Sequence, residues 1–193
     1  MKLKMKEIEI LVEISDDINK VLYIFNKFDY IDTSLVIDEY YYDPKRDNLK
    51  PNQNNNITEC LRLRTKGNKN YITYKDDVFD NDIWLYSNEY ETEVNNIDIL
   101  KEILNRLELK KLVTVKNNKK FYKYNTYEIT LEDVEDLGYF MEVEYLANED
   151  VDVKEIKKQI RDFIDSLGLN VKEANIGKPE MLLNKLNIKV EDE

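Results

Sequence analysis

The stretch Glu7–Ile14 has the sequence EIEILVEI, and its alternation predicts a β-strand with two unlike faces. Isoleucine or valine occupies every even position, whereas the odd positions hold Glu7, Glu9, Leu11 and Glu13. Side chains two residues apart share a face of a strand, so one face is apolar and the other is mostly acidic. Such a strand belongs either to an ordinary sheet with one wet face or to a site that needs carboxylates in fixed places.

Six or more predicted strands carry a charged or polar stripe opposite an apolar one. Same-sign pairs two residues apart occur at Arg62/Arg64, Glu89/Glu91 and Glu142/Glu144. Like charges on adjacent same-face positions repel, and a surface built only for solubility intersperses the two signs. At least three predicted helices have apolar stripes that need a sheet face to cover. If they cover the apolar face of a curled sheet, the charged faces turn inward and acids and bases converge in a barrel. A sheet with one solvated face and no site is the alternative.

Hydrophobic periodicity predicts mostly strands, with helices spaced between pairs of them. We expect strands near Leu35–Tyr42, Ile57–Thr65, Tyr71–Lys75, Trp84–Tyr86, Glu89–Val94, Lys111–Lys116, Lys119–Tyr124, Tyr127–Leu131 and Phe140–Tyr145. We expect helices over Ile18–Phe28, Ile97–Leu107 and Val153–Leu167, and a short one that begins near Pro179. The polar stretch Asp43–Asn56 predicts a flexible loop. Tight hairpins favour antiparallel pairing, and therefore an α+β fold with a large sheet or barrel.

Composition narrows the chemistry that the chain can perform. Its 193 residues suffice for one sizeable core, and 29 basic against 40 acidic residues give a net charge of −11, which argues against nucleic acid as a partner. The absence of histidine excludes histidine-dependent triads and histidine-ligated zinc, so carboxylates, lysine, arginine and tyrosine remain. No apolar run is long enough to span a membrane, and the single cysteine, Cys60, predicts a reducing cytoplasm.

Six short motifs in this order resemble the CYTH family of class IV adenylate cyclases and thiamine triphosphatases, also called triphosphate tunnel metalloenzymes. They are EIEI at Glu7–Ile10, DEYYYD at Asp38–Asp43, LRLR at Leu61–Arg64, ITYK at Ile72–Lys75, EYETEV at Glu89–Val94 and LEDVEDLGYFMEVE at Leu131–Glu144. The resemblance implies an eight-stranded antiparallel closed β-barrel, the tunnel, with helices packed outside. Residues 1–170 would form this domain, and residues 171–193 a helical extension packed on or near the barrel.

The resemblance also implies a triphosphate bound in the tunnel with Mg²⁺ or Mn²⁺, an occupant that neutralises both signs of charge. By resemblance, the catalytic residues are Glu7, Glu9 and Glu132, the substrate-binding residues are Arg62, Arg64, Lys75, Lys116 and Lys120, and the metal ligands are Glu89, Glu91, Glu142 and Glu144. Arginine and lysine would contact phosphate oxygens, while glutamates would hold the hard cation.

Three positions depart from the family pattern, because Leu11, Ser87 and Asn118 stand where basic residues are usual. A shifted register could let Lys119 or Lys120 serve instead. The leading hypothesis is hydrolysis of a phosphoanhydride bond in tripolyphosphate, thiamine triphosphate or a nucleoside triphosphate. Two alternatives stay open: an adenylate cyclase that converts ATP to cyclic AMP and pyrophosphate, and a non-catalytic module that binds polyphosphate or nucleotide. A homodimer is also compatible with the sequence.

Overall fold

The structure of the protein is a computed structural model that describes residues 6–81, 83–147 and 151–190. The strands are β1 (Lys6–Ile14), β2 (Asp29–Tyr42), β3 (Glu59–Lys66), β4 (Lys69–Asp80), β5 (Ile83–Glu93), β6 (Lys110–Tyr124), β7 (Tyr127–Val134), β8 (Gly138–Ala147) and β9 (Val171–Glu173). The helices are α1 (Ile18–Phe25), the short 3₁₀ helix η1 (Asp47–Leu49), α2 (Ile97–Arg106), α3 (Val153–Ser166) and α4 (Lys178–Lys185).

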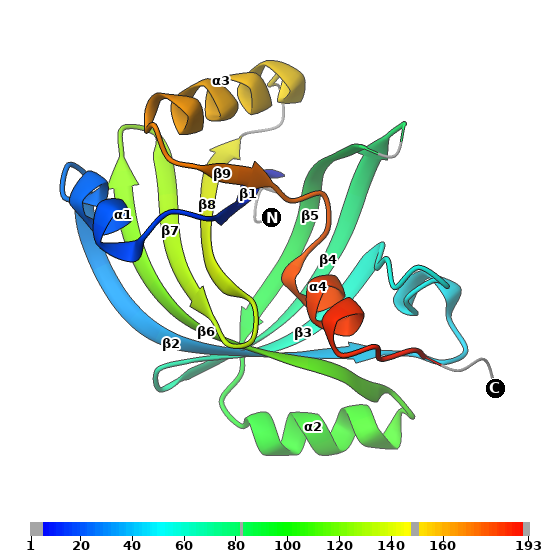
Figure 1. The fold of residues 1–193 in the computed structure, drawn as a ribbon. Helices are drawn as coiled ribbons and strands as arrows, with labels where there is room; N and C mark the ends of the chain where they lie inside the picture. Colours follow the sequence, from blue (N-terminus) through cyan, green and yellow to red (C-terminus); the bar gives the residue numbers. More distant parts are fainter. Residues whose placement is uncertain (1–5, 82, 148–150, 191–193) are drawn as a thin grey trace. The chain divides into compact units, whose positions relative to one another are not determined.

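The sheet has the strand order β5-β4-β3-β2-β6-β7-β8-β1-β9, and β5 also pairs with β1. The ladder of β1 to β8 therefore closes on itself, and β9 adds to β1 (Figure 1). The predicted α+β fold class with a closed antiparallel sheet of eight strands is confirmed. The sequence pattern predicted two separate strands in the region of β5 and two in the region of β6. This prediction is wrong, because β5 and β6 are each one continuous strand that includes its central polar residues.

Two compact units divide the chain, and each is described by itself. Unit 1 comprises Met1–Ser34, Val78–Asn88 and Asn117–Asn175, and unit 2 comprises Leu35–Asp77, Glu89–Lys116 and Ile176–Glu193. Of the segment expected to be a helical extension, Val171–Glu173 is a strand paired with β1 in unit 1, whereas α4 belongs to unit 2.

The core of unit 1 lies between the apolar faces of β1, β7 and β8 and the helices α1 and α3. Its fully buried side chains include Ile8 and Ile10 of β1, Phe25 of α1 and Ile160 of α3. Asp17 caps α1 by accepting a hydrogen bond from the Asn19 N–H group. Glu7 and Glu9, on the odd-numbered face of β1, therefore lie outside this apolar core.

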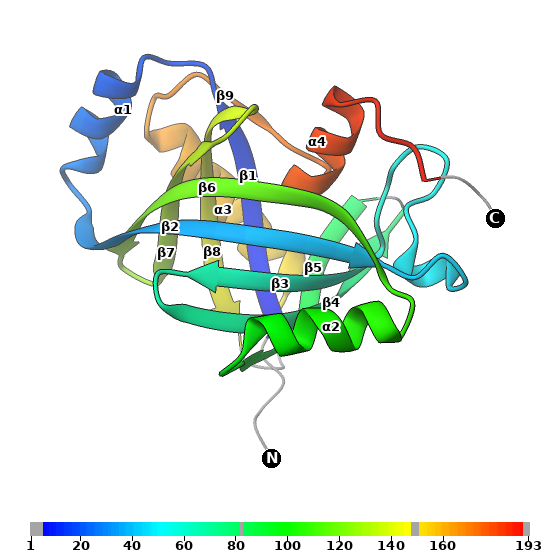
Figure 2. The same ribbon diagram turned by 90° about the horizontal axis from the view of Figure 1, so that it is seen from below.

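Unit 2 repeats the same layering with α2. Leu104 of α2 packs against Leu61 and Leu63 of β3, and α2 lies along β3 and β4 (Figure 2). Leu49 joins this core with 4% of its surface exposed. The expectation of a loose loop over Asp43–Asn56 is therefore wrong for its middle, because Leu49 anchors η1 in the core. Arg62 and Arg64 lie on the face of β3 opposite to α2.

The helix α4 is held in unit 2 by two polar contacts to the segment before β3. The carboxylate of Glu180 accepts a hydrogen bond from the Ile57 N–H group at 3.3 Å, and Asn55 Nδ2 donates to Asn184 Oδ1 at 2.9 Å. Pro179 occupies the first turn of α4, as predicted. Burial raises the pKa of Glu180 to about 7, with backbone hydrogen bonds opposing the shift and Asp77 adding to it. In the part of the chain that the structure describes, no helix is both long and apolar enough to cross a bilayer.

Replacing Glu180 by glutamine is expected to flatten the pH dependence of stability between pH 5 and pH 7.5. The folded-state pKa is about 7 and the ordinary value is 4.5, so in this window the unfolded chain loses the proton first. Stability of the wild type therefore falls as pH rises, by roughly 2–3 kcal/mol at most, and the Glu180→Gln variant lacks this loss. Urea unfolding at pH 5, 6 and 7.5 measures it, with Glu102→Gln on the exposed face of α2 as the control. Equal slopes in the wild type and Glu180→Gln would contradict this role of Glu180.

Candidate functional site

Unit 2 brings together four of the predicted site residues, with the buried guanidinium of Arg62 among them. Its side chain is 7% exposed, and Nη2 donates to Thr73 Oγ1 at 3.2 Å. The same atom lies 3.4 Å from Glu89 Oε1 and 3.5 Å from Glu91 Oε2. Lys75 Nζ forms an ion pair with Glu89 Oε2 at 3.0 Å. Two cations and two carboxylates therefore meet on the polar face of unit 2, a group that we call the basic cluster.

Arg64 differs from Arg62 because a single carboxylate holds its guanidinium at two points. Arg64 Nε donates to Asp38 Oδ1 at 2.7 Å, and Nη2 donates to Asp38 Oδ2 at 2.8 Å. Burial and the neighbouring Arg62 oppose the charge on Arg64, but Asp38 outweighs them and raises its pKa. Burial likewise opposes the charge on Arg62, and Asp38, Tyr40 and Glu89 raise its pKa well above the usual value. Both arginines are therefore fixed cations.

The arginine at position 62 retains a donor that the described residues leave unused. Arg62 Nε is buried and has no hydrogen-bond acceptor among the residues that the structure describes. A buried donor without an acceptor costs free energy, and a ligand oxygen would satisfy it. Cys60 lies on the same face, but burial raises the pKa of its thiol to about 12, so it is not a nucleophile.

Unit 1 brings together three carboxylates from two adjacent strands. One oxygen from each of Glu7, Glu9 and Glu144 lies within 4.8 Å of the others, and the register places Glu9 directly opposite Glu144. We call these residues the acidic cluster. Carboxylate oxygens at this spacing are the ligand type that Mg²⁺ and Mn²⁺ prefer, so the residues present fit a divalent cation. Glu142 is half-buried on β8 and lies opposite Leu11 of β1 and Thr130 of β7.

Glu132 is completely buried in unit 1 and has its own basic partner. Lys119 Nζ lies 3.1 Å from Glu132 Oε1, and Asn117 Nδ2 donates to the other carboxylate oxygen. Cross-strand register sets this pairing, because Lys119 lies opposite Glu132 whereas Lys120 lies opposite Leu131 on the helix-covered face. Among the described residues, Asn117 Oδ1 is buried without a hydrogen-bond partner.

The predicted site residues thus fall into different groups. The structure brings together Glu7, Glu9 and Glu144 in unit 1, and Arg62, Lys75, Glu89 and Glu91 in unit 2, with Arg64 paired to Asp38. Lys120 shares a face with the core residue Leu131. Lys116 is exposed, while its neighbours Val115 and Asn117 are buried, so it lies on the other face of β6 from Lys119.

Sequence reasoning missed Asp38 and Lys157 as charged residues of these sites, and it named Lys119 only as an alternative to Lys120. Asp38 is 4% exposed, and its position two residues after the buried Val36, on the same face of the strand, could have indicated its burial. For Lys119, the alternation of buried and exposed residues could have indicated its burial if β6 had been predicted as one continuous strand. Lys157 sits three residues before the buried Ile160 of α3, where a helical stripe calls for an apolar side chain.

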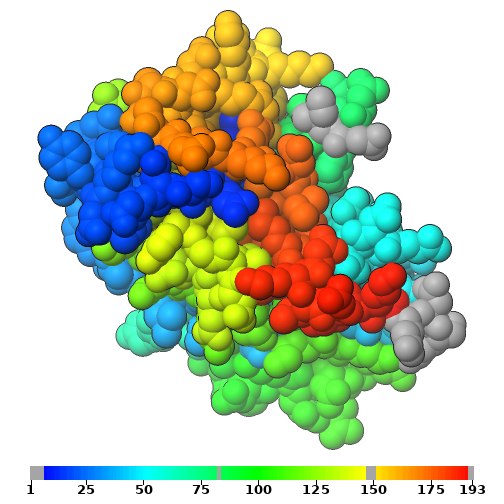
Figure 3. Space-filling model, viewed as in Figure 1, coloured from blue at the N-terminus to red at the C-terminus, as the bar shows by residue number. Residues whose placement is uncertain are grey.

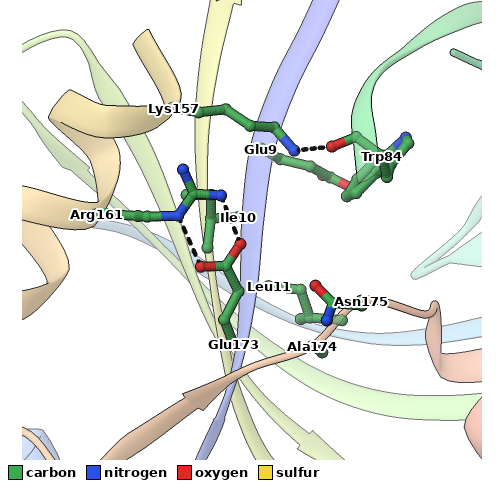
Figure 4. Close-up of a pocket in the computed structure, with 9 residues that line it drawn as sticks. All are labelled: Glu9, Ile10, Leu11, Trp84, Lys157, Arg161, Glu173, Ala174 and Asn175. Atoms are coloured by element: carbon green, nitrogen blue, oxygen red, sulfur yellow. Dashed lines mark hydrogen bonds and ion pairs between the residues drawn. The ribbon is translucent and has the colours of Figure 1, made fainter. Parts of the chain in front are cut away.

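A cavity of about 360 Å³ in unit 1, the α3 pocket, adjoins the acidic cluster through Glu9. It is lined by Glu9, Ile10, Leu11, Trp84, Lys157, Arg161, Glu173, Ala174 and Asn175. The space-filling view shows a hollow between α3 and β9, with β1 at its floor (Figure 3). In the close-up, Glu9 and Lys157 both extend toward Trp84, and Arg161 meets Glu173 across the pocket (Figure 4).

Lys157 is the most deeply buried cation of this pocket. It is 5% exposed, its Nζ donates to the Trp84 carbonyl oxygen at 2.5 Å, and it lies 4.7 Å from the centre of the Trp84 ring. Burial, and then the charge of Arg161, lower the pKa of Lys157 to about 8, although Glu173 and Glu9 oppose the shift. Arg161 is held by Glu173 through two hydrogen bonds of 2.8 and 2.9 Å.

A closed antiparallel sheet with clustered carboxylates and buried arginines on its polar faces is typical of proteins that bind phosphate groups with divalent metals. Comparison with family models gives the particular family. The CYTH domain model matches residues 5–174, and the chain therefore belongs to the CYTH domain family. The family is generally metal-dependent, in agreement with the donor set of the acidic cluster.

Individual relatives support the same placement. A protein of Methanocaldococcus jannaschii named "Putative adenylate cyclase" is 29% identical over 175 residues, which cover 89% of this chain and 94% of that protein. The solved structure of the PH1819 protein from Pyrococcus horikoshii is 26% identical, with a TM-score of 0.78 over 93% of this chain and 99% of that one. A Hippeastrum structure, described as a "putative adenylyl cyclase" with a dominant triphosphatase activity, shares the fold at 15% identity, with a TM-score of 0.64 and coverage of 97% of this chain and 99% of that one.

Removing one carboxylate of the acidic cluster is expected to reduce stabilisation by divalent metal. Thermal unfolding is followed with and without Mn²⁺ for the wild type and Glu9→Gln. A cation that binds only the folded state at 100 times its Kd adds about 2.7 kcal/mol, and Glu9→Gln should lose most of that gain. Glu13→Gln, an exposed glutamate on the same strand, is the control and should keep the full shift. An unshifted wild-type midpoint in saturating Mn²⁺ contradicts a metal site at these residues.

Replacing Asp38 by asparagine is expected to destabilise the protein by about 3 kcal/mol, because the mutation leaves the Arg64 cation without its carboxylate. The side chain of Asp38 is 5% exposed, so water does not replace the lost partner fully. Denaturant unfolding gives the free-energy difference. Glu102→Gln breaks the exposed pair with Arg106 and should cost less than about 0.5 kcal/mol. Similar losses in both variants would show that the Asp38–Arg64 pair is not specially important.

Proposed function

We propose that the protein is a divalent-metal-dependent enzyme that binds a triphosphate and hydrolyses one of its phosphoanhydride bonds. The observation that supports this most is Arg62, a buried cation with an unused Nε donor, Lys75 nearby and carboxylates around both. Charge-assisted hydrogen bonds from arginine to phosphate oxygens are among the strongest that a protein makes. The candidate substrates are tripolyphosphate, thiamine triphosphate and nucleoside triphosphates.

Each cluster has a separate part in this proposal. Arg62 and Lys75 would bind phosphate oxygens and stabilise the charge that develops during transfer. Arg64, already held by Asp38, would offer only the guanidinium N–H groups that Asp38 leaves over. Glu7, Glu9 and Glu144 would hold Mg²⁺ or Mn²⁺, with Glu89, Glu91 and Glu142 as further predicted ligands. The bound cation would neutralise phosphate charge and orient the reacting oxygens.

Glu132 was predicted to be catalytic, and we propose that it acts through its neighbours. Its carboxylate is fully buried, and its two oxygens contact Lys119 and Asn117. It would therefore fix the Lys119 ammonium for a phosphate contact rather than take a proton from water. Lys116 and Lys120, also predicted as phosphate ligands, are the weaker candidates, since Lys119 is the lysine of β6 that faces Glu132.

Cyclisation of ATP is the second candidate, favoured by the name of the Methanocaldococcus relative. In that reaction the ribose 3′-hydroxyl attacks the α-phosphate and pyrophosphate leaves. Hydrolysis needs fewer substrate contacts, because no base pocket is required, and we favour it for that reason. A binding module without turnover is the third candidate, because Leu11, Ser87 and Asn118 stand where the family usually has basic residues.

Because Cys60 is a free thiol, we further propose a cytoplasmic location, and a homodimer stays a prediction.

A substrate panel is expected to separate these reactions. Purified protein with Mg²⁺ or Mn²⁺ is incubated with tripolyphosphate, thiamine triphosphate or ATP, and the products are identified by ion chromatography. Orthophosphate release supports hydrolysis, whereas cyclic AMP with pyrophosphate supports the cyclase. Tight binding by calorimetry without any product would instead favour the binding module, and neither binding nor product would overturn the proposal.

Replacing Arg62 by glutamine is expected to lower kcat/KM for the preferred triphosphate by about 100-fold or more, the loss typical of one strong transition-state contact. Arg106→Gln on α2, where the arginine side chain is 81% exposed, is the matched control and should retain full activity. Circular dichroism checks that both variants fold. Unchanged kcat/KM in folded Arg62→Gln would exclude Arg62 from substrate binding.

A further inference from the structure

The α3 pocket contains the buried cation Lys157, whose ammonium group has fewer hydrogen-bond acceptors around it than it has donors. The Lys157 ammonium has three N–H donors, and among the residues that the structure describes it donates to one acceptor, the Trp84 carbonyl oxygen. Within the described residues, no carboxylate lies at ion-pair distance from Lys157 Nζ. A buried charge without a counter-ion is costly, and structures that keep one commonly use it at a site.

The remaining charges of the pocket leave room for an anion beside Lys157. Arg161 lies one helical turn after Lys157 on α3, and Figure 4 shows both side chains directed into the cavity. The two printed bonds between Arg161 and Glu173 neutralise Glu173 and use Nε and Nη2, so Nη1 can still donate. Glu9, the other carboxylate that lines the pocket, belongs to the acidic cluster, where a divalent cation would offset its charge.

The volume and the position of the cavity favour a compact anion. About 360 Å³ is far more than a water molecule needs and is at the small end of ligand sites. Orthophosphate and pyrophosphate present acceptor oxygens in several directions, so one anion can accept from Lys157 and Arg161 together. A single carboxylate has two oxygens in one plane, which makes it the poorer match to donors from two turns of α3.

We propose that the α3 pocket is a binding site for a small phosphate-class anion, orthophosphate or pyrophosphate, with Lys157 as its main ligand and Arg161 as its second. Trp84 forms the wall of the site. The site requires binding alone, so it stands independently of the reaction proposed above. If that reaction occurs, its released phosphate is the nearest supply of the anion.

Tryptophan fluorescence provides a local test, because Trp84 is the one tryptophan in the sequence and Lys157 lies over its ring. The wild type is titrated with orthophosphate, and separately with pyrophosphate, in Mg²⁺ at constant ionic strength. We expect a saturable change in intensity, at least tenfold weaker affinity in Lys157→Met, and unchanged affinity in Lys158→Met, the exposed neighbour on the same helix. Arg161→Gln should weaken binding to a lesser degree.

Several outcomes would overturn the site. A wild-type spectrum that does not change up to roughly 10 mM of either anion, ten times a Kd of about 1 mM, excludes the site without any variant. Equal affinity for malonate would refute the phosphate preference, and equal loss in Lys157→Met and Lys158→Met would refute the role of Lys157. Arg62→Gln should keep the fluorescence response even where turnover is lost, so failure of the enzymatic proposal and failure of this one are distinguishable.

Discussion

The rest of the structure depends on the alternation of apolar and charged residues along each strand, which gives each strand one apolar and one charged face. In unit 1, α1 and α3 bury the apolar faces of β1, β7 and β8, and in unit 2, α2 buries the apolar face of β3. In each unit, the charged faces of these strands therefore lie outside the apolar core. The acidic cluster and the basic cluster are therefore products of the same alternation that forms the two cores.

Buried charges in such an arrangement need partners that secondary structure supplies at fixed spacing. Cross-strand register places Arg64 opposite Asp38, Lys119 opposite Glu132 and Glu9 opposite Glu144. The first two pairs are complementary and stabilise one another. The third is a pair of like charges, which repel when they lie directly opposite each other. A divalent cation at the proposed metal site would offset this repulsion.

Much of the architecture could be read from the sequence, because alternation over eight strands and three amphipathic helices is a strong local signal. The pairing of particular lysines could not, since a shift of one residue moves every side chain to the opposite face. Lys119 and Lys120 are neighbours, yet only the ladder with β7 shows that Lys119 faces Glu132. The strands β5 and β6 were expected in two pieces, because their central asparagines and serine look like turns when tertiary partners are unknown. The burial of Lys157 could not be predicted for a related reason. It depends on Trp84 and residues of β1 that lie beside α3 in the folded protein.

The sequence contains no histidine, so the imidazole ionisations that fill the neutral range of most proteins are absent. Glu180 in unit 2, with a pKa of about 7, and Lys157 in unit 1, with a pKa of about 8, thus titrate in a pH range without histidine ionisations. A carboxyl carbon and an amine nitrogen are observed as different nuclei, ¹³C and ¹⁵N. Isotope-labelled protein therefore carries one natural spectroscopic probe in each unit, and each can be followed without a mutation or an attached dye.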